Sequence, residues 1–282
     1  MELVSVIMPC YNDGQYMEEA VRSVKEQTYP QWELIIIDDG SDDEETIQII
    51  NGMKAERIKI LHTDRLRPAG ARNYGIQHAD GRYILPLDAD DRIDQTYIEK
   101  AVNIMESDDR IGVVYCESDM FGAKTGKWDL PKYSFQTMLL DNIVFVTALF
   151  YREDWEKVGG FNRNMAAGME DYDFWLGILE LGKEIYQIPE ILFHYRIKPA
   201  SRTTGFQADY MQMQAVYRQI YDNHKVFYEK HQEEYAKMLR DALIEQVALR
   251  MKYEKMFERV QKYYRYPLIG RIIKKIIDRR IS

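Results

Sequence analysis

Three aspartates follow directly on an apolar run in the segment YILPLDADDRID, residues 83–94. Side chains two residues apart in an extended segment point the same way, so Asp88 and Asp90 can converge on one point. Converging carboxylates with no His or Cys beside them suit a hard cation, and magnesium commonly completes its shell with phosphate oxygens and water. The spacing therefore predicts Mn²⁺ or Mg²⁺ at Asp88 and Asp90, with a diphosphate as the third partner. We interpret Asp94 only as a helix cap.

Two common phosphate-binding motifs are missing from the sequence. It contains no GxxxxGK[ST] loop, and no GxGxxG follows a predicted strand, which argues against a P-loop and against a dinucleotide cofactor. Two other residues suit a nucleotide. Asp39 in DDGS can accept hydrogen bonds from a base or a ribose, and the Tyr11 ring can stack on a base.

The elements that must position these residues alternate through the first half of the chain. Near-continuous apolar runs predict strands, and helical spacing predicts the helices between them, the first holding Met17, Ala20, Val21 and Val24. The predicted strands are 4–8, 33–38, 58–61 and 83–87, and the later helices begin near Asp42 or Asp43 and cover 71–79 and 96–105. This βαβ pattern predicts a parallel sheet with right-handed crossovers.

Ligands of such sheets bind beyond the carboxyl ends of the strands. Polar residues follow three of the predicted strands, at 9–13, 38–41 and 88–91. One acidic strand end is an ordinary turn, whereas three at one rim favour a binding site.

Beyond residue 110 the pattern changes. It becomes mixed, with short strands near 111–116, 148–151, 184–188 and 191–196, and all-helical beyond about 205. We predict an α/β domain over 1–204, with a first half at about 1–110 and a second half at about 111–204. Residues 205–282 are predicted to form a helical C-terminal extension.

Composition narrows the class of protein. The 282 residues carry a formal net charge of −8, which argues against nucleic acid as a partner. Cys10 and Cys116 lie in apolar runs and are interpreted as buried free thiols. The N-terminus resembles a first strand rather than a signal peptide, and no apolar run reaches the ~18 residues that span a bilayer, so a cytoplasmic location is expected.

Four sequence blocks resemble the motif series of family 2 glycosyltransferases, which have the GT-A fold. The blocks are VSVIMPCYN, IIIDDGSDD, AGARNYGIQHADGRYILPLDADD and GGFNRNMAAGMEDYDFWLGILELG. They occur in the family's order over roughly residues 3–200. The resemblance implies a Rossmann-like, mostly parallel sheet with helices on both faces, and an inverting enzyme that uses a nucleotide-diphosphate sugar, most often a UDP-sugar. It also implies that 1–204 is the catalytic domain, with a nucleotide-sugar half at about 1–110 and an acceptor half at about 111–204.

The resemblance also implies roles for individual residues. The nucleotide pocket would be lined by Pro9, Tyr11 and Asn12, with Asp39 on the base. Arg72 would border the nucleotide and diphosphate, and Asp90 would be the more direct metal ligand of the DxD pair.

The segment GMEDYDFW matches the block that carries the catalytic base, which assigns this role to Asp171 and an acceptor contact to Glu170. The chemistry is coherent on its own, because a sugar hydroxyl is a poor nucleophile and needs a carboxylate to take its proton. The same segment also fits a capped amphipathic helix with Phe174 and Trp175 in the core, and both interpretations can hold.

One position departs from the family pattern. Many relatives place a His two residues after the arginine of the YR element, often as a further metal ligand, whereas this chain has Lys198 there. A protonated lysine cannot bind a metal, so we expect Lys198, together with Arg202, to contact the diphosphate. The third protein ligand of the metal is left open.

The C-terminal segment YYRYPLIGRIIKKIIDRRIS is strongly basic: seven Lys or Arg and one acid lie between Gln261 and Ser282. An isoleucine-rich stripe opposite a basic face predicts a helix that lies on an anionic membrane, although packing on its own domain or in a homodimer fits the apolar face as well. A peripheral position on the inner face of the cell membrane would suit a glycan or lipid-linked acceptor of a bacterial envelope polysaccharide.

Two other functions compete with transfer. A sugar nucleotidyltransferase should carry a Gly-rich triphosphate loop after its first strand, where this chain has PCYNDGQY. A non-catalytic scaffold that binds nucleotide sugars is disfavoured by the presence of Asp88, Asp90 and Asp171. The sequence names neither the donor sugar, the acceptor, the linkage nor the oligomeric state.

Overall fold

The computed structural model describes residues 1–53, 55–198 and 209–264, except for the side chains of 262–264. The chain forms two compact units, Met1–Lys230 and His231–Ser282. The predicted boundary between residues 204 and 205 lies outside the described residues, as do Arg202 and the basic segment from 265 onward.

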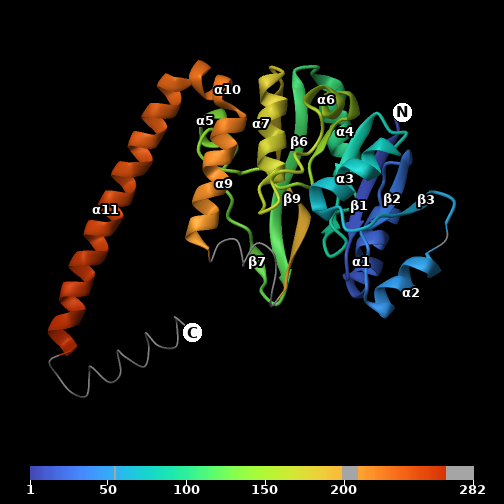
Figure 1. Ribbon diagram of the computed structural model, residues 1–282, viewed down its shortest axis with the longest axis horizontal. Coiled ribbons are helices and arrows are strands. Elements are labelled where there is room, and N and C mark those ends of the chain that lie inside the picture. The colour runs from blue at the N-terminus through green and yellow to red at the C-terminus, as the bar shows by residue number, and fades with distance from the viewer. Residues whose placement is uncertain (54, 199–208, 265–282) are drawn as a thin grey trace. The chain divides into compact units, whose positions relative to one another are not determined.

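A mixed sheet of nine strands forms the centre of the first unit (Figure 1). Its strand order is β3-β2-β1-β4-β8-β6-β9-β5, with β7 paired to β6. The strands are β1 (Val4–Cys10), β2 (Trp32–Asp38), β3 (Ile58–His62), β4 (Tyr83–Pro86), β5 (Arg92–Ile93), β6 (Ile111–Gly122), β7 (Gly126–Lys127), β8 (Leu149–Tyr151) and β9 (Glu184–Ile197).

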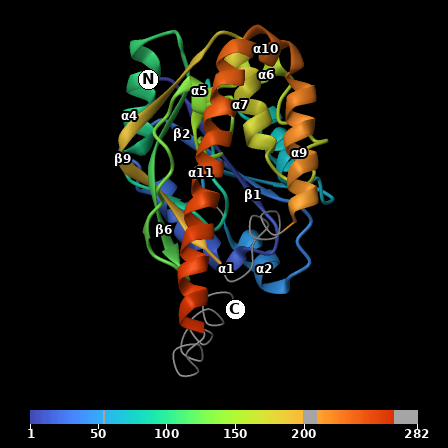
Figure 2. The same cartoon turned by 90° about the vertical axis from the view of Figure 1, so that its left-hand side faces the viewer.

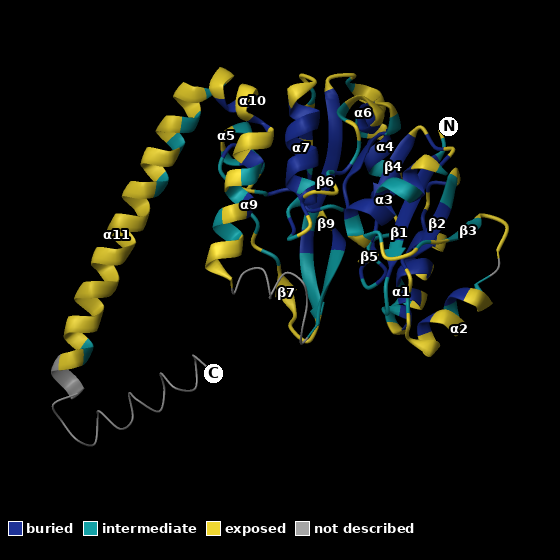
Figure 3. Ribbon diagram, in the orientation of Figure 1, coloured by how far each residue is buried: buried dark blue, intermediate teal, exposed yellow. Residues whose placement is uncertain are grey.

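The first four strands along the order are parallel, as their sequence pattern predicts. The connecting helices are α1 (Gly14–Lys25), α2 (Glu44–Gly52) and α3 (Arg67–Gln77), and α4 (Tyr97–Ser107) follows β5. The Asp43 carboxylate accepts the Thr46 amide and caps α2, one of the two predicted caps. Of these strands, β1, β2 and β4 are mostly buried because helices cover both faces of the sheet, whereas β3 at its edge is half-buried or exposed (Figure 3).

Helix α3 packs unusually close to the sheet at Gly75. A Cβ atom there would lie 2.6 Å from Ile37 Cδ1 and 2.8 Å from Ile7 Cγ2. Only glycine permits this approach, and it fixes the height of α3 over the strand ends. Arg72 lies one turn earlier on the same helix, so the glycine contributes to its placement.

The second half of the first unit contains antiparallel strand pairs, which the sequence pattern did not predict. β8 pairs antiparallel with both β4 and β6, whereas β6 and β9 run parallel. Helices α5 (Phe135–Met138), α6 (Arg152–Val158) and α7 (Glu170–Glu180) complete this half. Phe174 and Trp175 of α7 are fully buried, as the amphipathic interpretation of EDYDFW predicts.

Helices α9 (Tyr210–Asn223) and α10 (Lys225–Lys230) belong to the first unit and lie beside α7 (Figures 1 and 2). Tyr172 of α7 donates to the Met138 carbonyl and also approaches the Tyr228 hydroxyl, at 3.4 Å. The α/β architecture, with a mostly parallel half and a helical C-terminal segment, confirms the predicted fold class.

The described part of the second unit is one helix, α11 (Gln232–Tyr264), which is exposed along most of its length (Figure 3). Among the described residues, none of the helices combines the length and apolar composition that a membrane crossing requires. Cys10 and Cys116 are buried free thiols, as predicted, and burial raises the pKa of Cys10 to about 12.

Candidate active site

The polar ends of the parallel strands meet at one rim, as the sequence predicts. Cys10 at the end of β1 pairs with Asp38 at the end of β2, and the Leu87 amide after β4 donates to the Ile7 carbonyl of β1. The residues that follow these three strands are therefore neighbours in space.

Asn12 fastens the loop after β1 to the loop after β2. Its Oδ1 accepts the amides of Asp42 and Asp43 at 3.0 and 3.2 Å, and its own amide donates to the Ser41 hydroxyl. Its φ of 55° is in the left-handed region, which asparagine tolerates better than most residues. The predicted nucleotide contact of Asn12 stays a prediction, but its bonds hold the loop after β1 against the loop after β2.

The ring of Tyr11 is in contact with a side chain that the sequence did not predict. The Arg65 guanidinium lies 3.0 Å from the centroid of the Tyr11 ring, so it covers one face of that ring. A base that stacks on Tyr11 must use the other face or displace Arg65. Pro9, the third residue predicted to line the nucleotide pocket, is half-buried within β1.

Asp39 holds the loop before α3. Its carboxylate is buried and accepts hydrogen bonds from the Thr63 hydroxyl and from the amides of Leu66 and Arg67, at 2.6–2.8 Å. Arg65 and Arg67 both have a positive φ, so these bonds stabilise a strained turn. An ionised carboxylate has about four acceptor positions, so little capacity remains for the predicted base contact.

A cavity of about 470 Å³ adjoins this turn and is lined by Arg65, Leu66, Arg67, Arg163 and Asn164. None of its three arginines forms an ion pair among the described residues. The cavity therefore offers a cationic wall beside the predicted nucleotide residues, which suits an anionic ligand.

Arg72 joins two carboxylates that lie far apart in the sequence. Its guanidinium donates to Asp88 at 2.7 Å and to Glu170 at 2.9 Å, and its side chain is only 5% exposed. Burial alone would lower the pKa of Arg72, but Asp88 and Glu170 outweigh burial and raise it, so the cation is permanent. The predicted diphosphate neighbour is thus a fixed charge at the junction of α3, the end of β4 and α7.

This network brings α7 to the rim. Asp171 is the second residue of α7, and its Oδ1 accepts the Tyr172 amide. Glu170, predicted to contact the acceptor, is buried and accepts a hydrogen bond from Arg72. Its acceptor contact stays a prediction, and so does the role of Asp171 as the base.

Lys198, just beyond β9, bridges two strand ends. Its ammonium lies 2.8 Å from Asp90 and 2.8 Å from Asp13, a carboxylate that follows β1 and that sequence reasoning did not single out. Burial and the neighbouring Asp88 raise the pKa of Asp90, although Lys198 opposes this shift. Burial lowers the pKa of Lys198, but its hydrogen bonds to both carboxylates outweigh burial and raise it.

The predicted metal ligands do not present an open donor set in this arrangement. Asp88 is paired with Arg72, and Asp90 is paired with Lys198. Within residues 1–53, 55–198 and 209–264, no three His, Cys, Asp or Glu side chains gather as a metal site requires. The ligand role of Asp88 and Asp90 stays a prediction, and the geometry as it stands favours a protein cation there.

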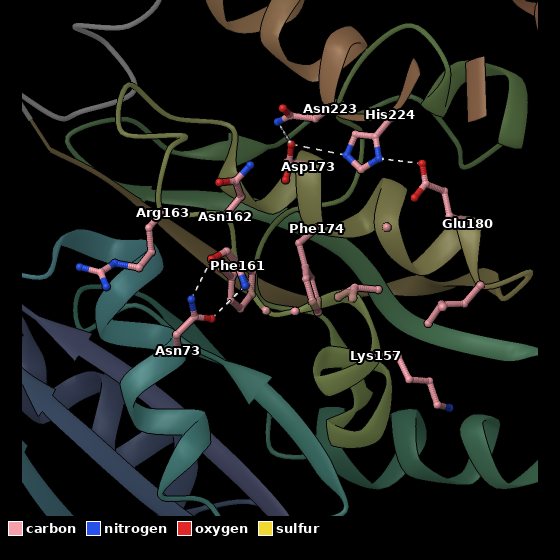
Figure 4. Close-up of a pocket in the computed structure, with 15 residues that line it drawn as sticks. Asn73, Lys157, Phe161, Asn162, Arg163, Asp173, Phe174, Glu180, Asn223 and His224 are labelled. Carbon is pink, nitrogen blue, oxygen red and sulfur yellow. Dashed lines mark hydrogen bonds and ion pairs between the residues drawn. The ribbon is translucent and has the colours of Figure 1, made fainter. Parts of the chain in front are cut away.

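A larger cavity, of about 720 Å³, lies beside α7 (Figure 4). Its lining comes from the loop 159–163, from α6 and α7, from Asn73 of α3 and from Asn223 and His224 at the end of α9. Asn73 fastens this loop by accepting the Phe161 amide and donating to the Phe161 carbonyl. The cavity contains none of the residues that follow β1, β2 and β4, so we do not assign the donor site to it.

His224 is the most constrained ionisable group of this second cavity. It lies 2.9 Å from Glu180 and 3.4 Å from Asp173, and Asn223 donates to the same Asp173 carboxylate at 2.6 Å (Figure 4). Burial lowers the pKa of His224, but the bonds to the two carboxylates outweigh burial and raise it. The cluster fixes the end of α9 on α7.

Comparisons with known proteins identify the family of the chain. The model of the family described as "Glycosyl transferase family 2" matches residues 5–166. An uncharacterized glycosyltransferase of Haemophilus influenzae is 44% identical over 108 residues, 37% of this chain and 43% of the relative. An uncharacterized glycosyltransferase of Rickettsia typhi is 31% identical over 214 residues, 71% of this chain and 66% of the relative. The matches thus span between 43% and 66% of the length of these two relatives.

Two further similarities are to proteins with more specific names. TuaG of Bacillus subtilis, provisionally named as a teichuronic acid biosynthesis glycosyltransferase, is 29% identical over 69% of this chain and 79% of its own length. The crystal structure of Staphylococcus aureus TarS 1–349 in complex with UDP-GlcNAc superposes with a TM-score of 0.66. The identity is 18%, and the superposition covers 78% of this chain and 66% of TarS. At that identity the structural likeness supports the fold.

Proposed function

The chain belongs to the family 2 glycosyltransferases, and on that premise we propose that it transfers a sugar from a UDP-sugar, with inversion, to a hydroxyl of a glycan or lipid-linked glycan during envelope polysaccharide synthesis. The donor class is supported by TarS, which was crystallised with UDP and with UDP-GlcNAc. The polysaccharide class is supported by the name of TuaG.

One observation carries the proposal. Arg72 is buried between Asp88 at the strand ends and Glu170 at the start of α7. This arrangement joins the rim that would hold the nucleotide diphosphate to the helix that carries Asp171. A donor on the rim and an acceptor hydroxyl beside α7 would then meet at one place, as direct displacement requires.

The proposed reaction is one in-line displacement. The acceptor oxygen forms a bond to the anomeric carbon while the bond from that carbon to the diphosphate oxygen breaks, and the electron pair leaves with UDP. Asp171 takes the proton of the attacking hydroxyl. The Arg72 guanidinium, a fixed cation beside Asp88, helps to offset the charge that develops on the leaving group.

We expect UDP to stabilise the protein more than GDP, dTDP or CMP in a thermal-shift series at equal concentration. A ligand at about 100 times its Kd adds about 2.7 kcal/mol to the free energy of unfolding, which is a measurable rise in Tm. Uridine is the control, because it carries the base without the diphosphate. A series in which no nucleotide raises Tm, or in which uridine equals UDP, would contradict the proposed donor.

A further inference from the structure

We propose that the ammonium of Lys198 is the resident cation of the donor site, where it occupies the place of a divalent metal ion and binds the donor diphosphate directly. The inference rests on the proposed function and deepens it, because it predicts a family 2 site that binds UDP without metal. Three features of the described structure carry it.

The first feature is the bridging geometry. Lys198 Nζ lies 2.8 Å from an oxygen of Asp90 and 2.8 Å from an oxygen of Asp13. It thus ties the loop after β4 to the loop after β1, a connection that a bound divalent ion commonly makes. An ammonium has three N–H donors, and two are used here. Among the described residues no third acceptor meets it, and the side chain is 21% exposed at the rim.

The second feature is how firmly the end of β9 is held. Two residues before the lysine, the Arg196 amide donates to the Asp91 carboxylate at 2.7 Å, and the Arg196 Nε donates to the Asp90 carbonyl at 2.7 Å. The Arg196 guanidinium also lies between the rings of Tyr16 and Phe121, 4.5 and 4.3 Å from their centroids. Lys198 therefore reaches Asp90 from a backbone that is bonded to the same acidic loop.

The third feature is the charge already present. Asp88 has Arg72 as its partner, and Asp90 has Lys198. A divalent ion that bound both carboxylates would have to displace two cations or lie beside them. Arg72 is buried and also paired with Glu170, so its withdrawal would break a second buried ion pair. A diphosphate needs to displace neither cation, since as an anion it can bind to both Arg72 and Lys198.

In the reaction the lysine would act on the leaving group. As the bond between the anomeric carbon and the diphosphate oxygen breaks, negative charge collects on the terminal phosphate of UDP, and the third N–H of Lys198 donates to it. The lysine keeps its proton throughout. The proton of the acceptor hydroxyl goes to Asp171, so no further reactant is needed.

The test measures UDP binding by calorimetry on the full chain, once in EDTA and once in Mn²⁺. We expect the same Kd in both. Lys198→Met should weaken binding by roughly ten- to a hundredfold, the loss typical of a hydrogen bond to a charged group. The control is Lys127→Met, because Lys127 forms a similar close pair with Glu117 outside the site and should leave the Kd unchanged. Tm values of both variants establish that they are folded.

The outcomes separate the two proposals. If wild-type protein binds UDP only with Mn²⁺, the lysine inference is overturned and the proposed transferase stands. If Lys198→Met binds UDP as tightly as wild type, the inference also fails. If UDP binds under neither condition, the proposed donor fails, and the inference that rests on it fails too. Metal-independent binding that is lost in Lys198→Met supports both.

Discussion

Asp171→Asn is expected to lower the rate of sugar transfer by about 10²–10⁴ while UDP still binds, because an amide cannot take the proton of the acceptor hydroxyl. Asp171 is at the start of α7, where Glu170 is held against Arg72, so the substitution alters the base within a fixed frame. The measurement is release of UDP from a UDP-sugar in the presence of acceptor, together with the Kd for UDP.

The matched control is Asp173→Asn on the same helix. Asp173 faces Asn223 and His224 in the second cavity, and an amide there can still bond to them. This variant should retain transfer at a rate near that of wild type once its Tm shows it to be folded. Equal losses in the two variants, or full transfer by Asp171→Asn, would remove the base assignment.

Arg72→Met is expected to lower the free energy of unfolding by about 3–5 kcal/mol and to abolish transfer, because it breaks the buried ion pair between Arg72 and Glu170. The double variant Arg72→Met with Glu170→Gln should recover much of the stability, since the buried charge is then removed as well. It should not recover transfer, because the cation beside Asp88 is still missing.

Chemical denaturation and the transfer assay together check this prediction. Arg82→Met is the control: its ion pair with Glu2 is 3.3 Å long and about half exposed on both sides, and such surface pairs contribute about 0–1 kcal/mol. If Arg72→Met is no less stable than Arg82→Met, the buried network does not organise the site as described. If the double variant transfers sugar, the cation is dispensable.

The parallel half of the fold was predictable because its signals are local. Near-continuous apolar runs mark β1, β2 and β4, and polar residues mark where these three strands end. The helices between the strands follow from their own apolar spacing. The predicted strand ends at 9–13, 38–41 and 88–91 do meet at one rim. The antiparallel insertion of β8 was not predictable, because a strand of three residues carries no periodic pattern and its neighbours are chosen by tertiary packing.

The site residues also fall into two groups, those that local motifs predict and those that only the folded chain brings together. Asp88, Asp90 and Asp171 follow from motifs, but the pairing of Arg72 with Glu170 joins residues 98 positions apart. Asp13 was not predicted as a site residue, because an aspartate before a helix is most often a cap. In the structure its side chain does not cap α1. It pairs with Lys198 instead, 185 positions away. Arg65 gave no signal beyond lying near a turn, and only the folded chain places it on Tyr11.

The measurement that tests the central claim most directly is hydrogen exchange with and without saturating UDP. The account predicts slower exchange in the amides after β1, β2 and β4, above all in 10–13, 39–42 and 87–91, because these loops form the rim that would hold the nucleotide. The part of the second cavity that does not border the cationic cavity, in 159–162 and 223–224, should be unaffected. Protection confined to these residues, with the rim unchanged, would contradict this prediction and move the donor site to the second cavity.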